Sequence, residues 1–116
     1  MQYIMYSTEA PVDAPPPTME QLAQLDQLTK DAQAAGVLIT TGGAANKGTR
    51  IRTRGGQHNV TDGPFIEAKE LMGGFAIFDV PTLEDAIAWG KRFRSIIGDG
   101  ESELVRIYGP SDYAGG

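Results

Sequence analysis

The sequence predicts an α+β fold in one domain, and three observations lead to it. Two stretches with apolar residues at helical spacing alternate with short runs rich in β-branched and aromatic residues. Two further strand-like runs flank a Gly-Gly pair in the middle of the chain. The resulting order is strand, helix, strand, hairpin, strand, helix, strand. This order is typical of a ferredoxin-like split βαβ arrangement with an inserted β-hairpin.

Length and composition restrict the classes of protein that fit. The chain has 116 residues, so we expect one domain over residues 1–110 and a flexible C-terminal tail over residues 111–116. Cysteine is absent, which excludes disulfides, thiolate metal sites and cysteine nucleophiles. The formal net charge of −5 disfavours nucleic acid as a partner. Without an apolar run that could cross a bilayer or a signal segment, no membrane contact and a cytoplasmic location are expected.

The first half of the split arrangement is a strand, a helix and a second strand. Gln2–Tyr6 is rich in β-branched and aromatic residues and predicts the first strand. Thr18 and Gln21 match a capping box, so they predict the start of a helix whose apolar stripe runs from Met19 to Ala35. Gly36 is suited to the position that follows the helix, after which a second strand is expected at residues 37–40.

The second half repeats this order. Residues 75–80 carry apolar side chains on both faces, as in a strand that is covered on both sides. Thr82 predicts the cap of a second helix, and Trp89 lies beside the stripe that this helix buries. Residues 101–108 predict the last strand. Right-handed crossovers then place both helices on one face of an antiparallel sheet.

The other face of that sheet would have no cover within the chain. Its central strands nevertheless carry apolar residues on both sides, and a large apolar patch is not left in water. Pairing of two such faces resolves the conflict. The sequence therefore predicts a homodimer of the dimeric α+β barrel type.

The middle of the chain predicts a hairpin that carries a row of cations. Residues 42–49 contain glycines at 42, 43 and 48 that bracket four residues, as in phosphate-binding loops. The lysine that should follow the last glycine and the following helix are missing, so we expect a plain loop. Arg50, Arg52 and Arg54 alternate with other residues on the first strand and should share one face. That face is either a solvated surface or a site for a small carboxylate or phosphate. Arg52 is expected to lie nearest to Asp62 across the hairpin.

Asp62-Gly63-Pro64-Phe65 is the most distinctive motif. Gly63 permits unusual dihedral angles and Pro64 lacks a backbone donor, so a turn is predicted there. The Asp62 carboxylate could cap that turn, or it could act as an acid or base. Glu67 and Lys69 follow closely and would lie beside the same turn.

Together with the glycine pair before Phe75, these residues resemble the DGPF branch of the YCII-related family. The resemblance covers nearly the whole chain and implies the barrel fold described above. It also implies extracytoplasmic-function sigma factors as a class of partner. Most members have no established activity. The wider group resembles small enzymes with a His-Asp pair whose histidine lies near the start of the chain, where this sequence has Tyr3 and Tyr6.

Two functions remain open from the sequence. In the first, the protein is an enzyme that performs acid-base chemistry on a small anionic organic molecule. Asp62 would be its catalytic residue, and Arg52, Lys69 and Glu67 would bind substrate. In the second, it is a non-catalytic ligand-binding or regulatory module, in which the same residues fix a turn and an interface. His58 is expected to be solvated at the hairpin tip, and neither a metal nor a cofactor is expected.

Overall fold

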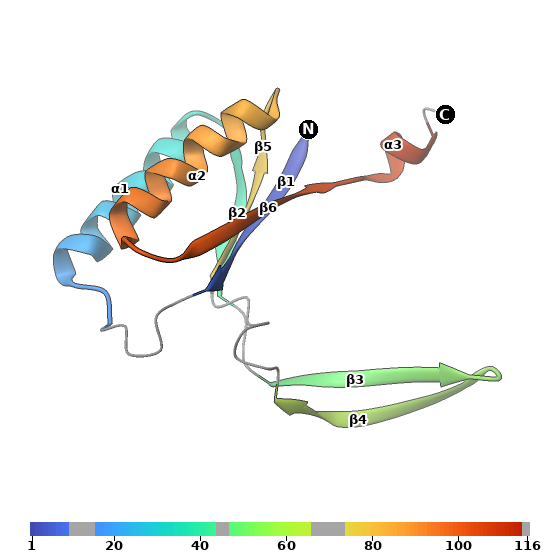
Figure 1. The fold of residues 1–116 in the computed structure, drawn as a ribbon. Coiled ribbons are helices and arrows are strands. Elements are labelled where there is room, and N and C mark those ends of the chain that lie inside the picture. Colours follow the sequence, from blue (N-terminus) through green and yellow to red (C-terminus); the bar gives the residue numbers. More distant parts are fainter. Residues whose placement is uncertain (10–15, 44–46, 66–73, 115–116) are drawn as a thin grey trace.

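The computed structural model describes residues 1–9, 16–43, 47–65 and 74–114. In chain order its elements are β1 (Gln2–Glu9), α1 (Met19–Ala34), β2 (Leu38–Gly42), β3 (Lys47–Arg54), β4 (Gln57–Phe65), β5 (Phe75–Asp79), α2 (Leu83–Ile97), β6 (Glu101–Ile107) and α3 (Pro110–Ala114), as Figure 1 shows. The predicted order of strands, hairpin and long helices is confirmed, and the short helix α3 is an addition.

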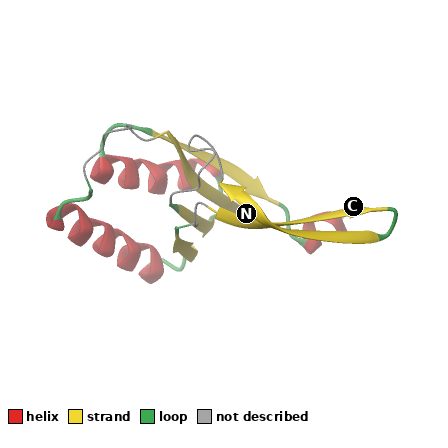
Figure 2. Cartoon of the chain, turned by 90° about the horizontal axis from the view of Figure 1, so that it is seen from below, coloured by secondary structure: helices red, strands yellow, loops and turns green. Residues whose placement is uncertain are grey.

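Four strands form one antiparallel sheet in the order β2-β5-β1-β6. The helices α1 and α2 lie side by side on one face of this sheet (Figure 1, Figure 2). The strand that opens each half of the chain, β1 or β5, is therefore central, and the strand that closes each half lies at an edge. This is the ferredoxin-like split βαβ arrangement that the sequence predicts.

Both long helices begin where the sequence predicts their caps. The Thr18 hydroxyl accepts a hydrogen bond from the Gln21 N–H at 3.1 Å, and the Gln21 side chain accepts one from the Thr18 N–H at 2.9 Å. The Thr82 hydroxyl accepts from the Asp85 N–H at 3.2 Å. Gly36, with a φ of 72°, follows α1 in the left-handed region that glycine favours. None of the helices in the described ranges is both long and apolar enough to cross a membrane.

The core lies between the helices and the sheet. Its most buried side chains come from β1, from β5 and the residue after it, and from α2: Tyr3, Met5, Phe78, Val80 and Ala86. In the predicted stripe of α1, Ala32 is buried and Leu25 and Leu28 are half-buried. Met19 and Leu22 are 87% and 53% exposed, whereas Ala32 is 3% exposed. The first turns of α1 extend beyond the sheet, so helical spacing alone overestimates the buried length of this helix.

β3 and β4 form the predicted hairpin, which projects from the body of the molecule (Figure 1). Arg54 pairs with Gln57 across the turn, so the loop consists of Gly55 and Gly56 alone. These glycines have φ values of 55° and 79°, the positive values that a two-residue hairpin turn of type I′ requires. The Gly-Gly turn is therefore confirmed.

The DGPF motif lies within β4 and forms no turn. Asp62 is opposite Thr49 and Phe65 is opposite Lys47, so two residues of β4, Gly63 and Pro64, face a single residue of β3. This extra residue makes a β-bulge. A bulge tolerates proline because the extra residue need not donate a ladder hydrogen bond. The prediction of a turn at Gly63-Pro64 is wrong, and the motif accommodates an irregularity in a continuing strand.

The C-terminal segment also differs from the expected tail. Helix α3 is held to the end of β6 by Asp112, whose carboxylate accepts from the Gly109 N–H at 2.7 Å and pairs with Arg106 at 3.4 Å. Arg106 also lies over the Tyr108 ring, 4.9 Å from its centroid. Up to Ala114 these contacts give the segment a helical form.

Candidate ligand-binding cavity

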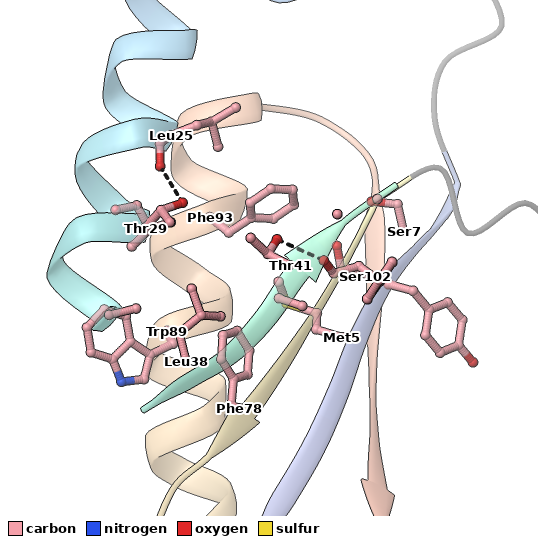
Figure 3. Close-up of a pocket in the computed structure, with 17 residues that line it drawn as sticks. Met5, Ser7, Leu25, Thr29, Leu38, Thr41, Phe78, Trp89, Phe93 and Ser102 are labelled. Atoms are coloured by element: carbon pink, nitrogen blue, oxygen red, sulfur yellow. Dashed lines mark hydrogen bonds between the residues drawn. The ribbon is translucent and has the colours of Figure 1, made fainter. Parts of the chain in front are cut away.

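A cavity of about 210 Å³ lies between the helical layer and the four-stranded sheet, and Figure 3 shows it in close-up. One wall is the helix-facing side of β1, β2 and β5, and the other is formed by α1 and α2. The strand register explains the first wall. Met5 is directly across from Ala76 on one side and Leu104 on the other, so these three side chains point to the same face.

Most of the cavity wall is apolar. Trp89 and Phe93 of α2 and Phe78 of β5 supply aromatic surface, as Figure 3 shows. Leu25 and Leu28 reach it from α1. Helical spacing places Trp89 and Phe93 on one side of α2, since residues four apart lie one above the other. Such a wall favours a ligand with a large apolar surface.

Hydroxyl groups interrupt this apolar surface. Ser7 and Ser102 are cross-strand neighbours on β1 and β6, so their side chains lie close together at one end of the cavity. The Ser102 hydroxyl accepts a long hydrogen bond of 3.4 Å from Arg94. The Ser7 hydroxyl has no hydrogen-bond partner within the described part of the chain. The pair can therefore donate or accept a hydrogen bond toward a ligand.

The hydroxyls of the two lining threonines already have hydrogen-bond partners. Thr29 donates to the Leu25 carbonyl at 3.0 Å, and Thr41 donates to the Phe75 carbonyl at 2.9 Å, as the dashed lines in Figure 3 mark. These bonds satisfy the threonines locally. Ser7 and Ser102 are left as the polar groups best suited to fix the orientation of a bound molecule.

The described residues that line the cavity include no aspartate, glutamate, histidine, lysine or arginine. Tyr6 is the titratable residue among them, and its hydroxyl points elsewhere: it donates to Glu103 at 3.0 Å. That hydrogen bond is the main reason why the pKa of the Tyr6 hydroxyl is raised. Acid-base chemistry by the described lining therefore lacks a suitable group.

An ion pair joins the two helices next to Trp89, which lines the cavity. Arg92 of α2 donates to Asp31 of α1 at 2.7 Å, and Gln27 donates to the same carboxylate at 2.8 Å. Arg92 also lies over the ring of Trp89, 4.9 Å from its centroid. The Arg92 guanidinium, followed by Gln27, lowers the pKa of the Asp31 carboxyl. These contacts fix the spacing of the two helices beside a residue that lines the cavity.

The residues that the sequence suggests as a site lie elsewhere. Arg52 is paired with Asn59 and Asp62 with Thr49, so the two fall on opposite faces of the hairpin. The prediction that Arg52 lies close to Asp62 is therefore wrong. Both are exposed. The other two predicted substrate-binding residues, Glu67 and Lys69, lie outside the described residues.

The arginine row itself follows the predicted alternation. The partners of Arg50, Arg52 and Arg54 are Thr61, Asn59 and Gln57, which occupy the same hairpin face. Arg50 and Arg52 line a shallow depression there together with Asn59 and Thr61. We call this surface, made by the three arginines and their three cross-strand partners, the arginine face.

His58 lies near the hairpin tip and is exposed, and its Nδ1 is 2.9 Å from the Thr53 hydroxyl. Asp62 is on the same face of β4 but four residues further, roughly 13 Å along a strand. A His-Asp pair between them is thus not formed. Near the start of the chain, the Tyr3 side chain is buried in the core. No group of three His, Cys, Asp or Glu side chains in the described ranges could hold a metal ion.

Comparison with known proteins shows the family to which this chain belongs. The family model of the YCII-related domain matches residues 1–108. The chain belongs to the YCII-related family. This match covers all four strands of the main sheet, both long helices and the hairpin. None of the curated proteins matches this YCII-related chain.

Among solved structures, the YCII-related chain is similar to 5-chloro-2-hydroxyhydroquinone dehydrochlorinase (TftG) from Burkholderia phenoliruptrix, in complex with 2,5-dihydroxybenzoquinone. The two are 11% identical over 93% of this chain and 94% of that one, with a TM-score of 0.48. A likeness this distant says nothing of the chemistry of this chain.

No motif in this YCII-related protein points directly to the cavity. Its lining residues are ordinary core residues when they are considered one by one, and Trp89 is predicted beside the buried stripe of α2. The available clue was Ser7 and Ser102, two small polar residues in or next to the predicted first and last strands. Their pairing depends on the register of β1 with β6, which becomes known only from the fold.

Proposed function

We propose that this YCII-related protein is a non-catalytic ligand-binding module. Its ligand is a small, uncharged and largely apolar molecule with one hydrogen-bonding group. The observation that carries this proposal is the cavity between the helices and the sheet, whose described lining is aromatic and aliphatic with no charged side chain. Burial of an unpaired charge there would be strongly unfavourable, so the lining selects against ions.

The volume of the cavity supports a ligand with one substituted ring. An apolar cavity of roughly 150 Å³ is large enough to hold benzene. The cavity of about 210 Å³ exceeds that, so it accommodates a substituted single ring. Aromatic side chains such as Trp89 and Phe93 would contact its faces or edges.

The hydroxyl pair of Ser7 and Ser102 would fix the orientation of that ligand. Arg94 donates to Ser102, which leaves the hydroxyl hydrogen of Ser102 free to point toward the cavity. A carbonyl or hydroxyl group on the ligand can then bind both serines. A carboxylate would have to leave water without meeting a cation in the described lining.

The proposal includes a homodimer formed through the sheet face that the helices leave open. Ile4 on β1 is directly across from Ile77 on β5 and Val105 on β6, so all three share that face. Val105 is 42% exposed. A second copy would remove this apolar row from water. The DGPF motif further supports assignment to the DGPF branch of the family.

The binding proposal is tested with two molecules of similar size and different charge, benzyl alcohol and benzoate. Trp89 is the only tryptophan in the chain and lines the cavity, so its fluorescence reports on occupancy. We expect benzyl alcohol to change the Trp89 emission in a saturable way and benzoate to leave it unchanged. Replacement of both Ser7 and Ser102 by alanine should lower the affinity for benzyl alcohol by about three- to tenfold, because the ligand then loses a hydrogen bond.

Two variants of α1 separate the effect of filling the cavity from the effect of enlarging a side chain elsewhere on the helix. Ala32→Leu adds volume at a buried lining position, and Ala23→Leu makes the same change at an exposed position of the same helix. Only Ala32→Leu should abolish the fluorescence change. Equal responses to benzyl alcohol and benzoate, or a response that survives Ala32→Leu in a folded protein, would contradict the proposal.

A further inference from the structure

In the part of the chain that the structure describes, the apolar side chains of the β3–β4 hairpin are exposed. Ile51 and Val60 are directly paired across it and are 69% and 62% exposed. A two-stranded hairpin is at best marginally stable in water unless it packs against something else. In Figure 1 and Figure 2 it projects away from the helices and from the main sheet. Ile51 and Val60 lie on the hairpin face opposite the arginines, so contact with another molecule through either face would stabilise the hairpin.

The charge of the hairpin points to an acidic surface. Residues 47–65 contain four of the ten basic residues and one of the fifteen acidic residues, so the hairpin carries +3 and the remainder of the chain carries −8. Arg50 and Arg52 have no carboxylate partner among the described residues. Guanidinium groups favour carboxylates, which they can bind through two parallel hydrogen bonds.

The chain itself presents such an acidic surface on β6. Glu101 and Glu103 are two residues apart on this strand, so they project from the same face, and both are exposed. Thr8 donates to Glu101 at 2.8 Å and Tyr6 donates to Glu103 at 3.0 Å. These bonds hold both carboxylates on the open face of the sheet, beside Val105. We call Glu101 and Glu103 the acidic strip.

We propose that the arginine face of each hairpin docks on the acidic strip of a second copy of the chain. In a two-fold dimer the contact occurs twice, because each copy supplies one arginine face and one acidic strip. The spacing of the charges agrees with this pairing. The arginines alternate along β3 and the glutamates alternate along β6, and alternate residues of a strand lie about 7 Å apart. This inference rests on the proposed homodimer and adds the hairpin as its second contact.

Charge reversal with rescue tests the contact. One variant replaces Arg50, Arg52 and Arg54 by glutamate, and the other replaces Glu101 and Glu103 by lysine. Sedimentation should show that each variant alone dimerises at least about tenfold more weakly than the wild type, because like charges then face each other. An equimolar mixture should form a heterodimer, since both of its contacts then join opposite charges.

A matched control keeps the change in net charge but moves it away from the strip. Glu20→Lys with Glu84→Lys alters two exposed acids at the starts of α1 and α2, on the helical side of the molecule. This variant should dimerise like the wild type. Raising the salt from about 0.05 M to about 0.5 M should weaken the wild-type dimer, and it should strengthen the dimer of the arginine variant, in which like charges face each other.

The outcomes distinguish failure of this inference from failure of the proposed homodimer on which it rests. A wild-type protein that stays monomeric overturns both. A stable dimer that is indifferent to both reversals overturns the docking of the hairpin and leaves the open-face dimer standing. Retention of the wild type on heparin, or binding of inorganic phosphate, that is lost in the arginine variant while the dimer persists would assign the arginine face to a free anion instead.

Discussion

At the scale of single residues, Asp31 has the clearest structural role. Its carboxylate accepts from Arg92 at 2.7 Å across the two helices, and Arg92 in turn lies over Trp89. The chain also contains a comparable ion pair within one helix, between Asp26 and Lys30 at 2.9 Å. The first pair joins two elements and the second joins two turns of one element. Only the first is expected to fix the separation of α1 and α2.

This difference predicts how stability changes with acid. Arg92 lowers the pKa of Asp31, so its ion pair stabilises the folded protein above the ordinary aspartate value of about 4. That contribution is lost as the pH falls through the lowered pKa. We expect Asp31→Asn to destabilise the protein at neutral pH and to make its urea midpoint less sensitive to pH below about 4. Asp26→Asn should leave most of the acid sensitivity in place, and equal effects of the two substitutions would contradict the role given to Asp31.

At the scale of elements, the contact between α2 and β1 depends on Gly90. A Cβ atom added there would lie 3.2 Å from the Met5 sulfur and 4.0 Å from a methyl carbon of Leu104. Met5 also borders the cavity, so its flexible side chain has space into which it can move. A small side chain at residue 90 therefore displaces a movable neighbour and does not press on backbone.

We expect Gly90→Ala to be nearly neutral. Alanine raises helix propensity by about 1 kcal/mol, and the displacement of Met5 offsets a similar amount. Gly90→Val should destabilise by about 1 to 3 kcal/mol, because a branched side chain overfills the same space. Urea denaturation measures both. Ala88→Gly, at an exposed position of α2, reports the propensity alone, and a loss above about 2 kcal/mol in Gly90→Ala would show that Met5 is fixed.

Local chemistry explains which elements could be predicted from the sequence. Thr18, Thr82 and Gly36 form helix ends through hydrogen bonds and dihedral preferences that involve only neighbouring residues, so their patterns could be interpreted correctly. The DGPF motif could not be interpreted correctly from the sequence alone. Gly63 and Pro64 permit a turn and a β-bulge equally well, and the choice depends on how β4 pairs with β3.

At the scale of the whole molecule, the candidate site depends on packing between distant segments. The cavity joins residues from both halves of the chain, such as Leu25 and Trp89, and its volume is what their side chains leave unfilled. No local pattern encodes an unfilled space. The charged residues of the hairpin are conspicuous in sequence and drew attention to Asp62 and Arg52, which the register places on opposite faces. The open apolar sheet face, in contrast, follows from strand order and alternation, both of which could be predicted.

That open face leads to the prediction for the assembled molecule. Val105 is 42% exposed on the sheet face without helices, and Leu83 is 43% exposed at the start of α2. Val105→Asp should weaken the homodimer at least about a hundredfold, because the new carboxylate would be buried against an apolar surface without a partner. Leu83→Asp should leave the dimer unchanged, and an acid in the first turn of a helix is favourable. Sedimentation over a range of concentrations compares the two variants, and a Val105→Asp protein that dimerises like Leu83→Asp would rule out the open face as the interface.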